Sequence, residues 1–269
     1  SVNWNILSER KEAKVNKDIV TETTLDEIVE NVICRRNSTS IPTLFGNVSH
    51  RSALEYDVVF VSNALIDEKV NLPILFLTSD IPMFVTQRRS IDGMPLFFLG
   101  GSAADFSEVF CGDSSDGKER GFIDGVFVGS GEGVVEEVVG ILMKYNKTPK
   151  GKNAAIKELY NIECFYNPLA YIHDFEEDGW TIREIRKIDD DAPDVVKISR
   201  PHNLDNHPGF ERKILHSSGA NVESSDIQIS MGCSGGGVCT FCHEAHVAGG
   251  WRERSIKRII KDMETARSY

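Results

Sequence analysis

Three of the six cysteines of this chain lie within ten residues, at Cys233, Cys239 and Cys242. Their spacing is Cys-x5-Cys-x2-Cys, and glycines occupy position 232 and positions 235–237. Glycine allows a backbone to fold tightly around a compact object and to direct N–H groups toward it. Thiolates are the usual ligands of iron–sulfur clusters, and three of them leave one iron of a [4Fe–4S] cube open to another ligand. We therefore predict that this cysteine loop, residues 233–242, holds a [4Fe–4S] cluster.

The segments on either side indicate how the loop is positioned. Residues 227–230 alternate apolar and polar side chains, which is typical of a strand. Beyond the loop, Ile256, Ile259, Ile260 and Met263 are spaced at i, i+3, i+4 and i+7, the apolar stripe of an amphipathic helix. The sequence thus predicts a strand, the cysteine loop and then a helix.

In these residues the chain resembles the radical SAM superfamily, in which three clustered cysteines hold a [4Fe–4S] cluster and S-adenosylmethionine binds the fourth iron. Phe241, just before the last cysteine, matches the family pattern, and so does the run of Arg252, Arg254 and Ser255 at the expected start of the helix. The first gap is longer than the common Cys-x3-Cys-x2-Cys spacing. The resemblance implies that the three cysteines are the metal ligands. Two interpretations of Arg252 and Arg254 stay open: they approach S-adenosylmethionine or the cluster, or they form surface salt bridges at the start of the helix.

The resemblance also implies an activity. Such enzymes cleave S-adenosylmethionine reductively to start radical chemistry, with an electron donor such as flavodoxin or ferredoxin. The strand, loop and helix would form the first unit of a (β/α) barrel that needs about six such units, on the general arithmetic of barrels. The chain is therefore expected to be the front part of a longer protein, or to have its barrel completed by a partner. The substrate is not predicted.

Other interpretations of the cysteines stay open. The clustered thiols with His243 or His246 could form a structural Cys3His zinc site, in a corrinoid- or nucleotide-binding module without catalysis. Cys34, Cys111 and Cys164 could bind a second cluster, as in a methylthiotransferase-like enzyme. A structural fragment with an empty cysteine loop is the third alternative.

Short apolar runs upstream predict a sheet. Residues 57–62, 73–78, 95–99 and 123–128 are rich in Val, Ile, Leu and Phe, which is typical of strands buried on both faces of a parallel sheet. The clearest helical pattern covers residues 132–145. Its predicted inward side chains are Val134, Val135, Val138, Val139, Leu142 and Met143. Alternating strands and helices indicate an α/β fold with a doubly wound parallel sheet.

Glycine-rich turns follow two of these predicted strands, at residues 100–102 and 129–133. Ligands of open α/β sheets lie outside the carboxyl ends of the strands, where these turns would lie. The Gly-x-Gly-x-x-Gly nucleotide fingerprint is not matched, because Val134 stands where its third glycine would be. Tight turns also use glycine for purely conformational reasons, so both interpretations stay open.

Residues 57–143 resemble the cobalamin (B12)-binding-type Rossmann domain that is fused to many radical SAM enzymes. The matching runs are residues 97–102 and 123–133, which carry its Gly-Gly turn and its Asp-x-Val-x-x-Gly-x-Gly-Glu turn. The Asp-x-His-x-x-Gly motif that supplies a histidine to cobalt is absent, so cobalamin binding and cobalamin-dependent methyl transfer are left open. The resemblance implies that the cofactor is lined by Ser62, Gly100, Gly101, Ser102, Gly129, Gly131 and Glu132.

The remaining segments complete the expected organisation. A polar stretch with Pro and Gly at 144–151 separates a B12-binding-like domain, residues 1–147, from a connector, residues 148–225, and the start of the barrel, residues 226–269. Further expected elements are helices at 24–36 and 153–160 and a hairpin of 171–175 with 180–185 around Asp178 and Gly179. Residues 189–191, three aspartates, are interpreted as a solvated turn.

Composition excludes some functions. The chain has 269 residues, 41% of them hydrophobic, a net charge of −11 and a pI near 5.2, which argues against nucleic acid as a partner. Its uncharged apolar runs are too short to span a bilayer, and no signal peptide opens it. The other three cysteines are scattered without a disulfide pattern. Together with an oxygen-sensitive cluster, this predicts a cytoplasmic location.

Overall fold

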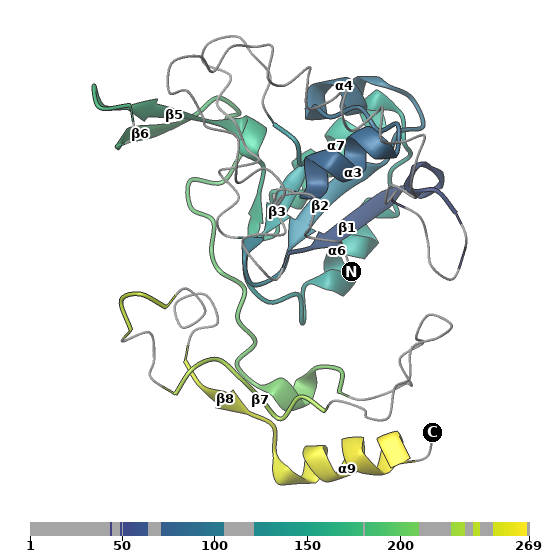
Figure 1. The fold of residues 1–269 in the computed structure, drawn as a ribbon, viewed down its shortest axis with the longest axis vertical. Coiled ribbons are helices and arrows are strands. Elements are labelled where there is room, and N and C mark those ends of the chain that lie inside the picture. The colour runs from purple at the N-terminus through teal and green to yellow at the C-terminus, as the bar shows by residue number, and fades with distance from the viewer. Residues whose placement is uncertain are drawn as a thin grey trace, which may run out of the picture.

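Four strands form the central sheet, in the order β1-β2-β3-β4 (Figure 1). β1, β2 and β3 are parallel, and β4 pairs antiparallel with β3. The strands span Val58–Ser62, Leu96–Gly100, Gly125–Phe127 and Phe165–Tyr166. The computed structural model describes residues 44, 49, 51–63, 71–104, 121–179, 181–209, 227–234, 239–242 and 250–267. The predicted helix at 24–36 lies outside these residues.

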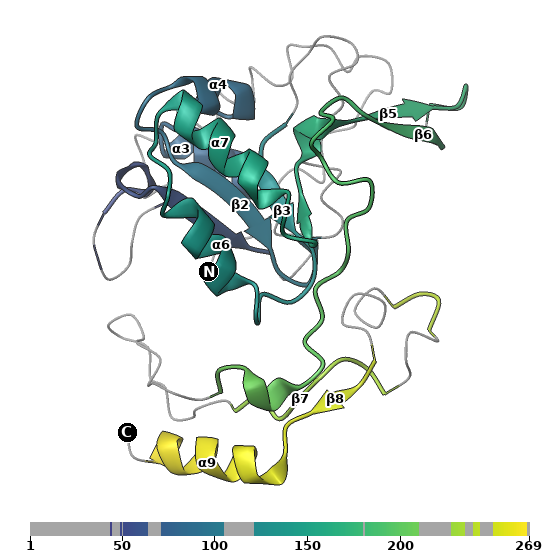
Figure 2. The same cartoon turned by 180° about the vertical axis from the view of Figure 1, so that it is seen from behind.

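Helices cover both faces of this sheet, so the α/β class that the sequence predicts is confirmed. α3 (Asn71–Thr78) lies over one face, and α6 (Val135–Leu142) and α7 (Pro149–Leu159) lie over the other (Figures 1 and 2). α4 (Val85–Ser90) precedes β2. The described parallel strands follow one another in chain order, without the reversal that marks the switch point of a doubly wound sheet.

β2 is the centre of the core because both of its faces are buried. Successive side chains of a strand point to opposite faces, so Leu96 and Phe98 pack toward α6 and α7 while Phe97 and Leu99 pack toward α3. The rings of Phe76 and Phe97 meet edge to face, with centroids 4.9 Å apart. The prediction of doubly buried strands holds for β2. For β1 it holds only in part, because β1 lies at the edge of the sheet that the described residues form, and Phe60 is half exposed.

The prediction of a strand at 73–78 is wrong, because this segment belongs to helix α3. Leu72 and Phe76 are buried four residues apart, which places them on one face of the helix. Pro73 lies in the first turn, where the missing N–H costs no hydrogen bond. A short apolar run does not by itself distinguish a strand from a buried helix.

Helix α6 is shorter than the predicted helix at 132–145, and its buried face is rotated. Gly133 has φ +81°, and the regular helix starts only after this turn. Val138 and Leu142 are buried as predicted, together with Ile141. Val135, Val139 and Met143, which the sequence predicts to face inward, are exposed.

Two other elements differ from the predictions in length. α7 begins at Pro149 rather than at 153, because the Thr148 side chain accepts a hydrogen bond from the N–H of Gly151 and caps the helix. β3 covers only part of the predicted run at 123–128.

The predicted hairpin is confirmed. β5 (Tyr171–Phe175) and β6 (Ile182–Lys187) pair antiparallel, and Gly179 has φ +71° in the turn between them. Arg186 forms a bidentate ion pair with Asp174 across the strands. Figure 1 shows this hairpin extending away from the sheet. Short 3-10 helices span Ala53–Glu55, Pro168–Ala170 and Leu204–Asn206.

A second small unit follows the linking segment, residues 195–209. It consists of a ribbon of β7 (Ser230–Met231) and β8 (Arg252–Glu253) and of helix α9 (Ile256–Arg267) (Figure 2). The predicted helix is confirmed, yet its apolar stripe faces outward, with Ile256 77% and Met263 56% exposed. Its buried side chain is Asp262, which pairs with Arg258. None of the helices in the described ranges is long and apolar enough to cross a membrane.

Candidate metal centre

The ribbon closes the base of the segment 233–250, which contains the cysteine loop. Ser230 pairs with Glu253 and Met231 with Arg252, and a further bridge joins Cys233 to Gly250. The chain therefore leaves the ribbon at residue 233 and returns to it at residue 250. The first cysteine lies at the paired base of the loop, where the ribbon limits its movement.

The other two cysteines share one turn. The N–H of Cys242 donates a 3.0 Å hydrogen bond to the carbonyl oxygen of Cys239, so the Cys-x2-Cys spacing closes into a turn. Cys239 is exposed and Cys242 half-buried, and Phe241 between them is 90% exposed. These thiols are accessible to a ligand from solvent.

Parts of the predicted site lie outside the described residues. These are the glycines at 235–237 and the alternative zinc ligands His243 and His246. Within the ranges that the structure describes, no three His, Cys, Asp or Glu side chains are already arranged to hold a metal ion. Binding of a metal would therefore require the thiols of the described cysteines to move closer to one another, and the rest of the loop to move with them.

Arg252 and Arg254 do not open the helix as the sequence predicts. Arg252 lies in β8, and helix α9 starts at Ile256 after Ser255, whose hydroxyl oxygen accepts from the N–H of Arg258. Arg252 donates to the carbonyl oxygen of Pro201 at 3.0 Å. Arg254 is only 5% exposed and donates to backbone carbonyls. These contacts do not support the predicted approach of the two arginines to a cofactor.

Two of the predicted cofactor residues, Ser62 and Gly100, end neighbouring strands at the carboxyl edge of the sheet. Ser62 lies beside Gly100 in the β1–β2 register. Gly101 has φ +105°, and a side chain there would overlap the backbone of Asn63. The N–H of Asn63 donates to the carbonyl oxygen of Gly100 at 2.7 Å. Gly101 is thus needed for the close approach of this chain's own backbone, whereas space is open at Gly100.

The second glycine turn, residues 129–133, is occupied by the linking segment. The N–H of Ser199 donates to Val128 at 2.9 Å, and its carbonyl oxygen accepts from Ser130 at 2.8 Å. A side chain at Gly129, whose φ is +98°, would overlap the Ser199 backbone. Gly131 and Glu132 lie in the same turn, and Ser102 is half-buried after β2.

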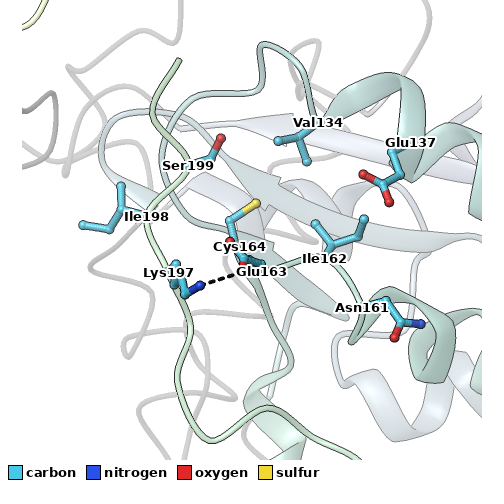
Figure 3. Close-up of a pocket in the computed structure, with 9 residues that line it drawn as sticks. All are labelled: Val134, Glu137, Asn161, Ile162, Glu163, Cys164, Lys197, Ile198 and Ser199. Carbon is cyan, nitrogen blue, oxygen red and sulfur yellow. Dashed lines mark hydrogen bonds and ion pairs between the residues drawn. The ribbon is translucent and has the colours of Figure 1, made fainter. Parts of the chain in front are cut away.

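A cleft that the sequence analysis missed opens beside this turn (Figure 3). Its volume is about 230 Å³, smaller than most sites for drug-sized ligands. Lys197 pairs with Glu163 at its rim, at 2.6 Å. Cys164 is 4% exposed, and burial raises the pKa of its thiol, which suits a packing role rather than a ligand role. Cys34 and Cys111, its partners in the two-cluster alternative, lie outside the described residues.

The three aspartates at 189–191 form a turn that is anchored to α7. Lys157 pairs with Asp189 and with Asp191, the latter at 2.7 Å, and the hydroxyl of Tyr160 donates to Asp189 at 2.8 Å. Burial acts to raise the pKa of Asp189, but the hydrogen bonds from Lys157 and Tyr160 outweigh it and lower that pKa. These contacts tie the turn to the protein itself.

The glycine turn and the ribbon also touch. The hydroxyl of Ser130 donates to the sulfur of Met231 at 3.5 Å, two residues before Cys233.

Comparison of the chain with family models, with curated proteins and with solved structures finds no match. Its function is therefore inferred from its own residues.

Proposed function

We propose that this chain binds a [4Fe–4S] cluster through Cys233, Cys239 and Cys242, and that it works as part of a radical SAM enzyme. The observation that carries the proposal is the arrangement of the cysteine loop. Three accessible thiols lie on one loop, and the base of that loop is closed by the ribbon.

The contrast with Cys164 supports a ligand role for these thiols. A cysteine that serves packing is usually buried and inert, as Cys164 is. Cys239 is exposed, and Cys233 and Cys242 are half-buried, so burial does not account for their presence. Soft thiolate sulfur is the preferred ligand of iron in iron–sulfur clusters.

The three cysteines would hold the cluster from two different parts of the loop. Cys233 provides one thiolate from the base, and the turn between Cys239 and Cys242 sets the spacing of the other two. All three thiols must lose their protons to act as ligands. When bound, the cluster supplies one electron for reductive cleavage of S-adenosylmethionine, and the protein supplies position and electrostatics.

Cobalamin is not part of this proposal. Gly101 and Gly129, two of the residues expected to line it, are in close contact with the chain's own backbone. This contact is by itself enough to account for glycine at these two positions.

The test is anaerobic reconstitution of the chain with iron and sulfide, followed by an absorption spectrum and by iron and sulfide analysis. We expect about four irons and four sulfides per chain, the content of one cube, and a broad visible charge-transfer band. Replacing Cys233, Cys239 or Cys242 by Ala should abolish the band in each case, because each change removes a ligand.

Cys164→Ala is the matched control and should keep the band, because this thiol is buried beside the cleft of Figure 3 and is not one of the proposed ligands. Zinc without sulfide in oxygen-free preparations would overturn the proposal and favour the Cys3His site. Twice the expected iron, lost on replacing Cys164, would favour the two-cluster alternative.

A further inference from the structure

Arg254 makes four side-chain hydrogen bonds close to the paired base of the cysteine loop. Its guanidinium donates to the carbonyl oxygens of Gln228 at 3.0 Å, Leu204 at 2.7 Å, His207 at 3.2 Å and Pro208 at 2.7 Å. One acceptor lies just before the ribbon, and the other three lie in the linking segment. Arg254 therefore joins two segments that are about twenty residues apart in the chain.

We propose that Arg254 is a positioning residue for the cluster, which it serves by holding the ribbon against the linking segment. This inference rests on the function proposed above. Arginine suits the task because its planar guanidinium presents five donors in a fixed fork. A buried donor or acceptor without a partner is costly, so the four bonds act together to hold the two segments in one arrangement.

Further hydrogen bonds of Arg254 and Arg252 connect the ribbon at the base of the cysteine loop with the linking segment. The N–H of Arg254 donates to Ile229 at 2.9 Å, which fixes the end of β8 beside the start of β7. Arg252 adds a bond to Pro201 in the same linking segment. The paired base of the cysteine loop is thus attached to the linking segment through two arginines.

The linking segment is in turn attached to the sheet. Ser199 forms backbone hydrogen bonds with the glycine turn, and the ring of His207 lies against Gly133. Ser130 of that turn contacts Met231 directly. The position of Cys233 relative to the sheet therefore depends on how firmly Arg254 holds the linking segment.

The test compares Arg254→Met, Arg254→Lys and Arg252→Met with the wild-type chain after anaerobic reconstitution. Cluster loss to a chelator is followed by the visible absorption band, and the reduced cluster is recorded by electron paramagnetic resonance. Arg183→Met is the matched control, since this arginine lies exposed on β6 in the projecting hairpin.

We expect Arg254→Met to lose its cluster about tenfold faster or more, the usual scale for residues that orient metal ligands, and to shift the resonance spectrum. Arg254→Lys should lie between Arg254→Met and wild type, because an ammonium has three donors at one point and cannot reach all four carbonyls. Arg252→Met, which removes the bond to Pro201 but leaves the four bonds of Arg254 in place, should have a smaller effect. Arg183→Met should match wild type.

Thermal unfolding separates positioning from stability. If Arg254→Met lowers the melting temperature but leaves the resonance spectrum and the chelator rate unchanged, Arg254 only stabilises the fold and the inference is overturned. If the wild-type chain takes up no iron and sulfide, the proposed function fails, and this inference fails with it. A wild-type cluster that Arg254→Met does not alter overturns this inference alone.

Discussion

A side chain at Gly129 would overlap the carbonyl oxygen of Ser199, and one at Gly101 would overlap Asn63. Both residues also have positive φ, where a Cβ is disfavoured. At the scale of single residues, these glycines serve the packing of backbone on backbone. The same residue type in the same kind of turn would equally suit a bound ligand, so the neighbouring segment decides its role.

Gly129→Ala should therefore lower the free energy of unfolding by roughly 2–4 kcal/mol, through strain at positive φ and displacement of Ser199. Gly140→Ala is the opposite control. Gly140 lies in α6 with open space around it, so Ala should raise that free energy by about 0.5–1 kcal/mol. Urea unfolding of both variants measures the difference, and equal effects would contradict the assignment.

Tyr160 connects three elements through its hydroxyl, which accepts from Asn167 and donates to Asp189. Burial is the main cause that raises its pKa from 10.0 to about 12. The hydroxyl of Tyr160 loses its proton at a lower pH in the unfolded chain than in the folded chain. The contribution of this hydroxyl to the free energy of unfolding is therefore complete below pH 10. It decreases as the pH rises from 10.0 to about 12.

Tyr160→Phe should consequently flatten the stability curve in this alkaline range. The comparison is urea unfolding of wild type and variant at several pH values between about 9 and 12, with tyrosinate absorbance recorded in parallel. An identical alkaline decline in both proteins would show that another group is responsible.

At the scale of elements, a buried network of charges joins α4, the start of β2, the segment before β3 and α7. Arg88 and Asp124 are fully buried, and Asp124 also accepts from Arg89 at 2.9 Å and from the N–H of Phe97 at 3.0 Å. Lys152 donates to the carbonyl oxygens of Arg88 and Ile91. The network lies at the amino ends of the strands, opposite the edge where ligands of such sheets bind. Its role is to hold elements together.

Asp124→Asn should lower the free energy of unfolding by about 3–5 kcal/mol, because it removes a buried carboxylate that pairs with both Arg88 and Arg89. The exposed pair of Asp174 and Arg186 is the matched control, and Asp174→Asn should have little effect because solvent screens that pair. Urea unfolding, which adds no salt that would screen charges, compares the free energy of unfolding of the two variants. Similar losses in both variants would contradict the distinction.

At the scale of the whole molecule, apolar side chains are buried in one part of the described structure and exposed in another. The side chains of β2 and its helices form cores on both faces of the sheet, whereas the apolar stripe of α9 faces outward. Burial of apolar surface is the main driving force of folding. The stability of the chain should therefore depend on the sheet and hardly at all on that stripe.

Phe97→Ala should lower the free energy of unfolding by about 3–5 kcal/mol, since this ring is fully buried against α3. Ile260→Lys should change it by less than about 0.5 kcal/mol, because half of that side chain is exposed on α9. Calorimetric melting of both variants tests this. A large loss in Ile260→Lys would show that the stripe is covered in solution.

Local patterns of the sequence determined much of the fold. β1, β2, the β5–β6 hairpin and α9 lie where periodicity and turn residues predict them, because these signals act between residues a few positions apart. The same signals were insufficient at 73–78, where a short apolar run forms α3, and at α6, whose buried face is rotated. In both cases the sheet selects the conformation or the face that it can bury.

For the candidate site, the sequence by itself determined that three cysteines, the proposed donors, lie on one loop, since ligand chemistry depends on residue type and spacing. Only the tertiary structure decided what surrounds them. It placed Ser199 on Gly129 and directed Arg254 to carbonyls of the linking segment. Such contacts join residues that are many positions apart, and no local pattern encodes which backbone will lie beside a given glycine or arginine.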